Sequence, residues 1–73
     1  MDMRRLVGEN VRRLRASRDM TQEQLSEVSG FSQQYISDLE RGRRNPTVVT
    51  LFDLAQALGA TPAELVTEQV PDA

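Results

Sequence analysis

The chain has 73 residues, a formal net charge of −2, and neither cysteine nor histidine. Disulfides, cysteine or histidine zinc sites and the usual nucleophile and base pairs of small hydrolases are therefore excluded, so we expect neither an enzyme nor a bound cofactor. No segment approaches the roughly 20 apolar residues of a membrane span, and the N-terminus lacks the apolar stretch of a secretory signal. The sequence predicts one soluble, cytoplasmic domain over residues 1–73.

Apolar residues recur at three- and four-residue spacing along the chain, which predicts an all-α fold of five helices. The first helix is expected from about Met3 to Arg18. Its apolar face consists of Met3, Val7, Val11 and Leu14. The next helix should begin with Thr21 as its N-cap and Gln24 as the partner in a capping box, and Gly30 should end it.

The third helix is expected to begin at the N-cap Ser32 and to end at Gly42. Only Ser29, Gly30 and Phe31 are left between it and the preceding helix. Because so short a connection cannot form an antiparallel hairpin, the two helices should cross steeply as a helix-turn-helix over residues 21–41.

The last two helices are predicted from their capping residues and apolar spacing. Pro46 and Thr47 should begin the fourth, and Gly59 should end it. Its inner face is expected to contain Val48, Leu51, Leu54, Ala55 and Leu58. Thr61, Pro62 and Glu64 give the fifth helix an N-cap, a first-turn proline and a capping-box partner, and the residues after Glu68 are expected to fray.

The outer side of the third helix is entirely polar when residues 32–41 are projected at about 100° per residue. An isolated helix with such a face would simply be solvated. These side chains, however, are mostly short or amide-bearing, and they lie at the end that a helix-turn-helix inserts into the major groove. We therefore expect base contacts from Gln33, Gln34, Ser37 and Asp38. Backbone contacts are expected from Gln22, Ser32, Tyr35, Arg41, Arg43, Arg44 and Asn45.

Residues 7–66 resemble the helix-turn-helix family of phage Cro and repressor proteins, also called XRE-like. The resemblance rests on VGENVRRLR, MTQEQLSEVSGFSQQYISDLERGRRNP and TLFDLAQALGATPAELV. It implies a compact five-helix domain like that of lambda repressor, a homodimer on a palindromic operator, and an internal ion pair between Arg15 and Glu40. The alternative for that pair is two solvated charges.

Two residues of the third helix leave alternatives open. Asp38 departs from the polar amide or base often found at its position in the family. It could accept a hydrogen bond from a cytosine N4 amine or repel a nearby phosphate. Tyr35 is bulky for its place and could pack against the sugar-phosphate backbone or in the core.

These features predict a sequence-specific transcriptional regulator bound to nucleoid DNA, either a repressor or a restriction-modification controller. A homodimer is expected because two related reading helices multiply discrimination, and RNA polymerase is a further candidate partner. Phe52, Leu65 and Val66 are candidate dimer contacts, although they could equally complete the core. The alternative function is an antitoxin-type interaction module that binds a toxin and autoregulates its operon.

Overall fold

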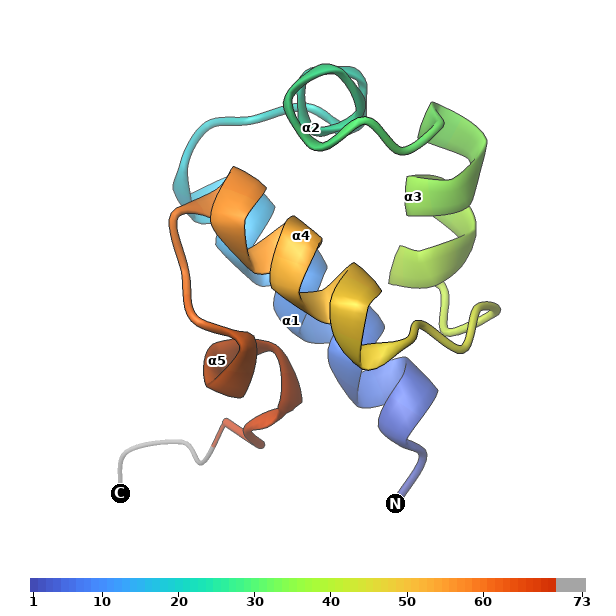
Figure 1. Cartoon of the computed structure of the whole chain (residues 1–73). Coiled ribbons are helices and arrows are strands. Elements are labelled where there is room, and N and C mark those ends of the chain that lie inside the picture. The colour runs from blue at the N-terminus through green and yellow to red at the C-terminus, as the bar shows by residue number, and fades with distance from the viewer. Residues whose placement is uncertain (70–73) are drawn as a thin grey trace.

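A computed structural model describes residues 1–69 of the chain. Within them the backbone forms five helices and no strands, which confirms the all-α prediction (Figure 1). The helices are α1 (Met3–Ser17), α2 (Gln22–Ser29), α3 (Gln33–Glu40), α4 (Val48–Leu58) and α5 (Pro62–Val66). Figure 1 shows α4 in front of α1, with α3 to one side and α5 near the lower end.

Side-chain caps set the starts of these helices as the sequence predicts. The Thr21 hydroxyl accepts the backbone N–H of Gln24, whose side chain accepts the N–H of Thr21, and Thr61 and Glu64 form the same capping box. Each box satisfies two backbone donors that a helix start leaves free. Gly30 ends α2 in the left-handed conformation, with φ of 81°.

A few boundaries differ from the expected ones. The first helix ends at Ser17, one residue early, and α3 ends at Glu40, with Gly42 in the following turn at φ of 75°. Pro46 lies outside α4, because Thr47 is the N-cap and its hydroxyl accepts the N–H of Thr50. Of the expected frayed tail, residues 70–73 lie outside the described residues.

The core draws on all five helices. Its fully or nearly fully buried apolar side chains are Val7, Val11, Leu14, Leu25, Ile36, Leu39, Leu54, Ala55, Leu58 and Leu65. Three predicted inner residues are not among them: Met3 is 48% exposed, Val48 is 80% exposed, and Leu51 is only partly buried against the core. Met3 and Val48 lie at the first position of their helices, where the other helices leave them uncovered. The periodicity predicted the buried stripe but extended it one residue too far toward each N-terminus.

The helix-turn-helix is formed by α2 and α3. In Figure 1 α2 is seen end-on while α3 runs along the page, so the two helices cross steeply, as predicted. Behind them, α1 approaches α3 so closely that a Cβ added to Gly8 would lie 2.4 Å from the Leu39 carbonyl oxygen. Gly8 therefore sets how near α1 comes to the C-terminal end of α3.

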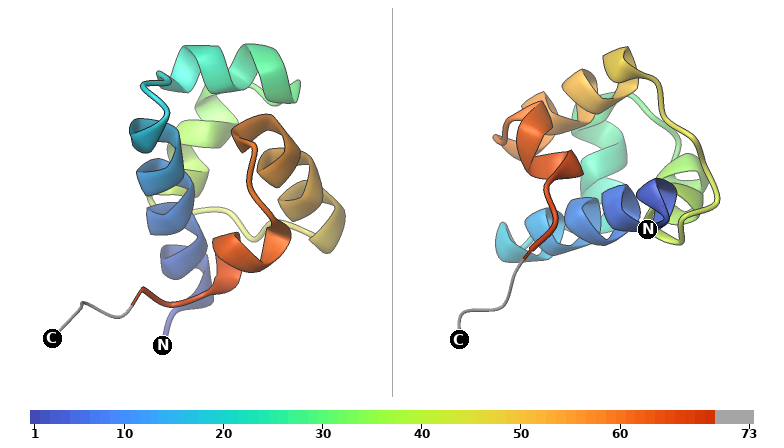
Figure 2. Two further views of the ribbon diagram at one scale, coloured as in Figure 1. Left: turned by 90° about the vertical axis from the view of Figure 1, so that its left-hand side faces the viewer. Right: turned by 90° about the horizontal axis from the view of Figure 1, so that it is seen from below.

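The fifth helix lies beside α1 (Figure 2) and is fastened there by one buried side chain. Asn10 is 2% exposed, and its Nδ2 donates to the carbonyls of Leu65 at 2.9 Å and Thr67 at 3.0 Å. This packing decides between the two alternatives left open for Leu65. Its side chain is 0% exposed and completes the core in place of a dimer contact, whereas Phe52 and Val66 remain 49% and 39% exposed.

Candidate nucleic-acid interface

The outer face of α3 presents the side chains that the sequence predicts to read bases. Gln33 and Gln34 are exposed in the first turn, and Ser37 and Asp38 are half-buried one turn further on. The Ser32 hydroxyl caps the helix by accepting a backbone N–H at 3.0 Å. The cap therefore fixes the end of α3 from which the two glutamines project into solvent.

The Asp38 carboxylate is already engaged within the protein. Its Oδ1 accepts from Gln34 Nε2 at 3.0 Å, and its Oδ2 lies 3.5 Å from a guanidinium nitrogen of Arg44. The Asp38 side chain is 19% exposed. Each carboxylate oxygen therefore already has one partner within the protein, and the charge is partly balanced by Arg44.

Tyr35 is half-buried and packs against the core. Its ring stacks on Phe31, with 5.2 Å between ring centroids and 22° between planes. The guanidinium of Arg44 lies over the same ring, 5.3 Å from its centroid, in a cation–π arrangement. The sequence left two alternatives for Tyr35, packing against the sugar-phosphate backbone or in the core, and in the structure its ring packs against the core. The ring also restrains an arginine that is a candidate phosphate contact.

A polar hollow lies between α1, α2 and α3. It is lined by Arg12, Arg15, Gln22, Ser37, Glu40 and Arg41. Two of the three arginines, Arg12 and Arg41, are exposed. Because Gln22 is the first residue of α2, the positive end of a helix dipole adds to these charges. The hollow is therefore suited to an anionic group such as a backbone phosphate.

An ion pair forms the inner wall of this hollow. Arg15 donates to Glu40 through Nε at 2.7 Å and through a terminal nitrogen at 3.0 Å, and it also donates to the carbonyl of Met20 at 2.8 Å. The Arg15 and Glu40 side chains are 15% and 4% exposed. The hydrogen bond to Glu40 raises the pKa of Arg15 above its ordinary value. Glu40 also accepts from Gln22 Nε2 at 3.1 Å, so the start of α2 is tied to the end of α3 through one carboxylate.

The loop after α3 brings some of the remaining candidates to the same region. Arg43 and Arg44 are exposed, and the Arg43 N–H donates to the Asp38 carbonyl at 2.9 Å, which holds the loop against the end of α3. Asn45 is exposed but lines a different, largely apolar hollow together with Pro46. The structure thus groups the loop arginines with α3 and leaves Asn45 apart from them.

Two residues of this architecture were missed in the sequence. Arg12 adds an exposed cation to the polar hollow, and the only signal for it was the net charge of +3 over residues 1–20. The sequence did not predict that Asn10 is buried and hydrogen-bonded, because the carbonyls to which it donates lie 55 and 57 residues further along the chain.

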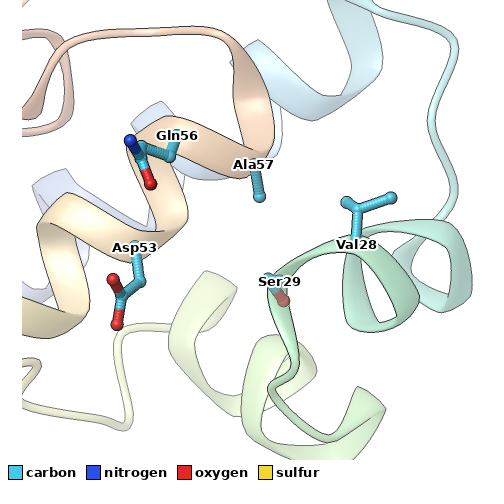
Figure 3. Close-up of a pocket in the computed structure, with 5 residues that line it drawn as sticks. All are labelled: Val28, Ser29, Asp53, Gln56 and Ala57. Atoms are coloured by element: carbon cyan, nitrogen blue, oxygen red, sulfur yellow. The ribbon is translucent and has the colours of Figure 1, made fainter.

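Another surface hollow lies where the end of α2 meets α4 (Figure 3). Its lining consists of Val28, Ser29, Asp53, Gln56 and Ala57. These residues include one acid and no base, so this hollow lacks the cations that a phosphate contact needs. The α3 side of the molecule is the better candidate for nucleic acid.

Over residues 1–69 no helix combines the length and apolar character needed to cross a membrane. The same residues contain no group of three or more histidine, cysteine, aspartate or glutamate side chains able to hold a metal ion.

Comparison with known proteins assigns the chain and its fold to one family. The family model described as helix-turn-helix matches residues 11–65. An uncharacterised HTH-type transcriptional regulator of Sinorhizobium fredii is 66% identical over 92% of this chain and 87% of its own length. Control protein C.SmaI of Serratia marcescens is 44% identical over 94% of this chain and 82% of its own length.

A solved structure supports the same assignment. The restriction-modification controller protein C.AhdI from Aeromonas hydrophila superposes with a TM-score of 0.81, at 37% identity over 85% of this chain and 94% of that one. The antitoxin alternative receives no support from these relatives, which are a transcriptional regulator and two control proteins.

Proposed function

The chain belongs to the helix-turn-helix family of DNA-binding transcriptional regulators, and on that basis we propose that it binds a palindromic operator as a homodimer. The family and these relatives are regulators of transcription rather than enzymes. The observation that carries the proposal is the pair of exposed glutamines, Gln33 and Gln34, at the capped N-terminal end of α3. This end of the second helix is the part that a helix-turn-helix places against base edges.

Base reading is assigned to Gln33, Gln34 and Ser37. A glutamine amide carries donors and an acceptor and can pair with the N6 and N7 groups of adenine. A serine hydroxyl can donate or accept against several bases, so it tolerates more than one partner. The N-terminal end of α3 is therefore rich in amides and carries no charge. This favours discrimination between bases over general attraction to phosphate.

Backbone contacts are assigned to the cations and helix ends around α3. Arg12, Gln22 and Arg41 face the polar hollow on one side, and the loop supplies Arg43 and Arg44 on the other. Ser32, Tyr35 and Asn45 are weaker candidates, because the first two are engaged in capping and core packing and Asn45 lines another hollow. The favoured arginines would neutralise phosphates on both sides of the reading helix.

The dimer contact is assigned to exposed apolar side chains at the start of α4 and the end of α5. Val48, Val49 and Phe52 are 80%, 69% and 49% exposed and lie within two turns of one another, and Val66 is 39% exposed. Apolar side chains of this size gain free energy when a partner covers them. A second copy of the chain is the partner that a palindromic operator requires.

A regulator of this kind acts in the cytoplasm on nucleoid DNA, where it either blocks RNA polymerase or touches it from an adjacent site. One relative is a control protein and a second is a restriction-modification controller protein, which favours a controller-like role over simple repression. The direction of control depends on where the operator lies relative to the promoter.

Selection of bound sequences from a random duplex library tests the proposal. We expect the wild-type protein to enrich one palindromic sequence. Gln33→Ala and Gln34→Ala should each relax base preference at a defined position by about 1–3 kcal/mol. Arg43→Ala is the matched control, because loss of a phosphate contact should weaken binding to all sequences alike. A wild-type protein that enriches no sequence at low salt would refute the proposal.

A further inference from the structure

The side chain of Gln34 has only one direction open for its amide. Its Nε2 lies 3.0 Å from Asp38 Oδ1, one helical turn away on the same face. An ionised carboxylate can only accept hydrogen bonds, so the amide must turn its nitrogen, and not its oxygen, toward Asp38. The carbonyl oxygen of Gln34 then points away from Asp38.

The Asp38 carboxylate is itself held in place. Its second oxygen lies 3.5 Å from the Arg44 guanidinium, which in turn lies over the ring of Tyr35. The backbone carbonyl of Asp38 accepts N–H groups from Arg41 and Arg43. The side chain is 19% exposed, so solvent competes little for it. Asp38 is therefore anchored at both its backbone and its side chain, and it can orient a more exposed neighbour.

We propose that Asp38 is a positioning residue that determines which bases Gln34 accepts, by fixing the orientation of the Gln34 amide. This inference rests on the proposed function of α3 as the reading helix. It replaces a direct role for Asp38 at a cytosine with an indirect one, because both carboxylate oxygens already have partners in the protein.

The fixed amide predicts a chemical preference at one operator position. With its oxygen turned outward, Gln34 requires a base that offers a donor in the major groove, which means the N6 amine of adenine or the N4 amine of cytosine. Guanine and thymine present acceptors there, at O6 and N7 or at O4, and they would face the outward oxygen without a proton between them. Adenine satisfies the amide best, because the second N–H of Gln34 is free to reach its N7.

Asp38→Asn tests this inference with almost no change in shape. An asparagine side chain can donate as well as accept, so it no longer dictates which end of the Gln34 amide faces outward. The wild-type protein should favour adenine or cytosine over guanine or thymine at the Gln34 position. Asp38→Asn should reduce that ratio about tenfold, while preferences at the other positions persist.

The Gln34→Ala background separates a positioning role from a direct one. If Asp38 acts through Gln34, adding Asp38→Asn to Gln34→Ala should leave the preference at that position as it is in Gln34→Ala alone. Unchanged discrimination in Asp38→Asn would overturn the inference. So would an equally large effect of Asp38→Asn in both backgrounds, because Asp38 would then contact the base itself.

A stability measurement and a second variant show whether a changed base preference comes from the Gln34 amide or from loss of the fold. Thermal unfolding of Asp38→Asn should give a melting temperature close to that of the wild type, because the backbone contacts of residue 38 are retained. If Asp38→Asn has a clearly lower melting temperature than the wild type, Asp38→Glu serves as the second variant. It keeps the charge but moves the carboxylate, so it should also alter the preference for adenine or cytosine at the Gln34 position. A wild-type protein without any preferred duplex would refute the proposed function itself, whereas a preference that survives both substitutions would refute only the role of Asp38.

Discussion

Glu40 and Asp38 are the two acids of the candidate interface, and Glu40 is the more deeply buried. The comparison separates a buried ion pair that supports the fold from an exposed pair on the surface. Glu40 accepts from Arg15 and from Gln22 while being 4% exposed. Arg44 also lies near an acid, Asp38, but its side chain is 48% exposed. A buried pair needs both partners, because a lone buried ion is costly, whereas an exposed pair contributes little.

We therefore expect Glu40→Ala to lower the free energy of unfolding by about 3 kcal/mol. The loss of Arg44 in Arg44→Ala should cost about 0–1 kcal/mol. Urea unfolding followed by circular dichroism compares the two variants, and Arg44→Ala serves as the control for removal of one charge. Equal midpoints would mean that the Arg15–Glu40 pair contributes no more than a surface contact.

At the scale of helices, local chemistry explains most of what the sequence predicted. Capping boxes at Thr21 and Thr61 and the glycine at position 30 act over a few residues, so their effect is legible in the chain itself. The exposed face of α3 was also predicted, because helical periodicity alone separates Gln33 and Gln34 from the buried Ile36.

The features that the sequence did not reveal depend on contacts between distant segments. Leu65 was a candidate dimer contact because an apolar residue near a chain end looks the same whether a core or a partner covers it. In the folded protein Asn10 bonds the carbonyls of Leu65 and Thr67, and the Leu65 side chain is buried with the core residues of the other helices. The engagement of Asp38 by Arg44 was invisible for the same reason, since it depends on how the loop after α3 folds back.

Gly8 gives a test of how two helices are placed against each other. A methyl group at this position would lie 2.4 Å from the Leu39 carbonyl oxygen and 2.9 Å from that of Glu40, and neither backbone atom can move without shifting α3. Alanine in a helix interior is usually favourable relative to glycine by about 1 kcal/mol. Here we expect the opposite sign, with Gly8→Ala destabilising the fold by about 1–3 kcal/mol through overpacking.

Thermal unfolding measures this effect, and Arg12→Ala is the control on the same helix, because Arg12 is exposed and should change stability by less than about 0.5 kcal/mol. A gain in stability for Gly8→Ala would show that α1 and α3 can separate without loss of packing. Operator binding adds a second readout, since displacement of the C-terminal end of α3 should also weaken recognition; this readout is compared with the wild type, because Arg12 is itself a proposed phosphate contact.

For the whole molecule, the net charge makes the positions of individual cations more important for DNA binding than overall electrostatic attraction. The net charge of −2 offers no general affinity for DNA, yet Arg12, Arg41, Arg43 and Arg44 are exposed around α3. Under the proposed function, binding is expected to come from placing these few cations against phosphates while the glutamines meet bases. One copy of the chain has one such surface, so the proposed function predicts that high affinity depends on two copies joined rigidly enough for both reading helices to engage.

The exposed apolar side chains of α4 are the expected contact between two copies of the chain, and Phe52→Glu tests this contact. A carboxylate in place of a 49% exposed ring should leave the monomer fold intact but place a charge in an apolar contact. We expect the variant to sediment as a monomer and to bind the full palindrome about 100-fold more weakly, because the second reading helix is no longer tethered to the first. Gln56→Glu, one turn later on the same helix and also exposed, introduces the same charge and should remain dimeric. If Phe52→Glu sediments as a dimer with wild-type operator affinity, the twofold contact must lie on another face.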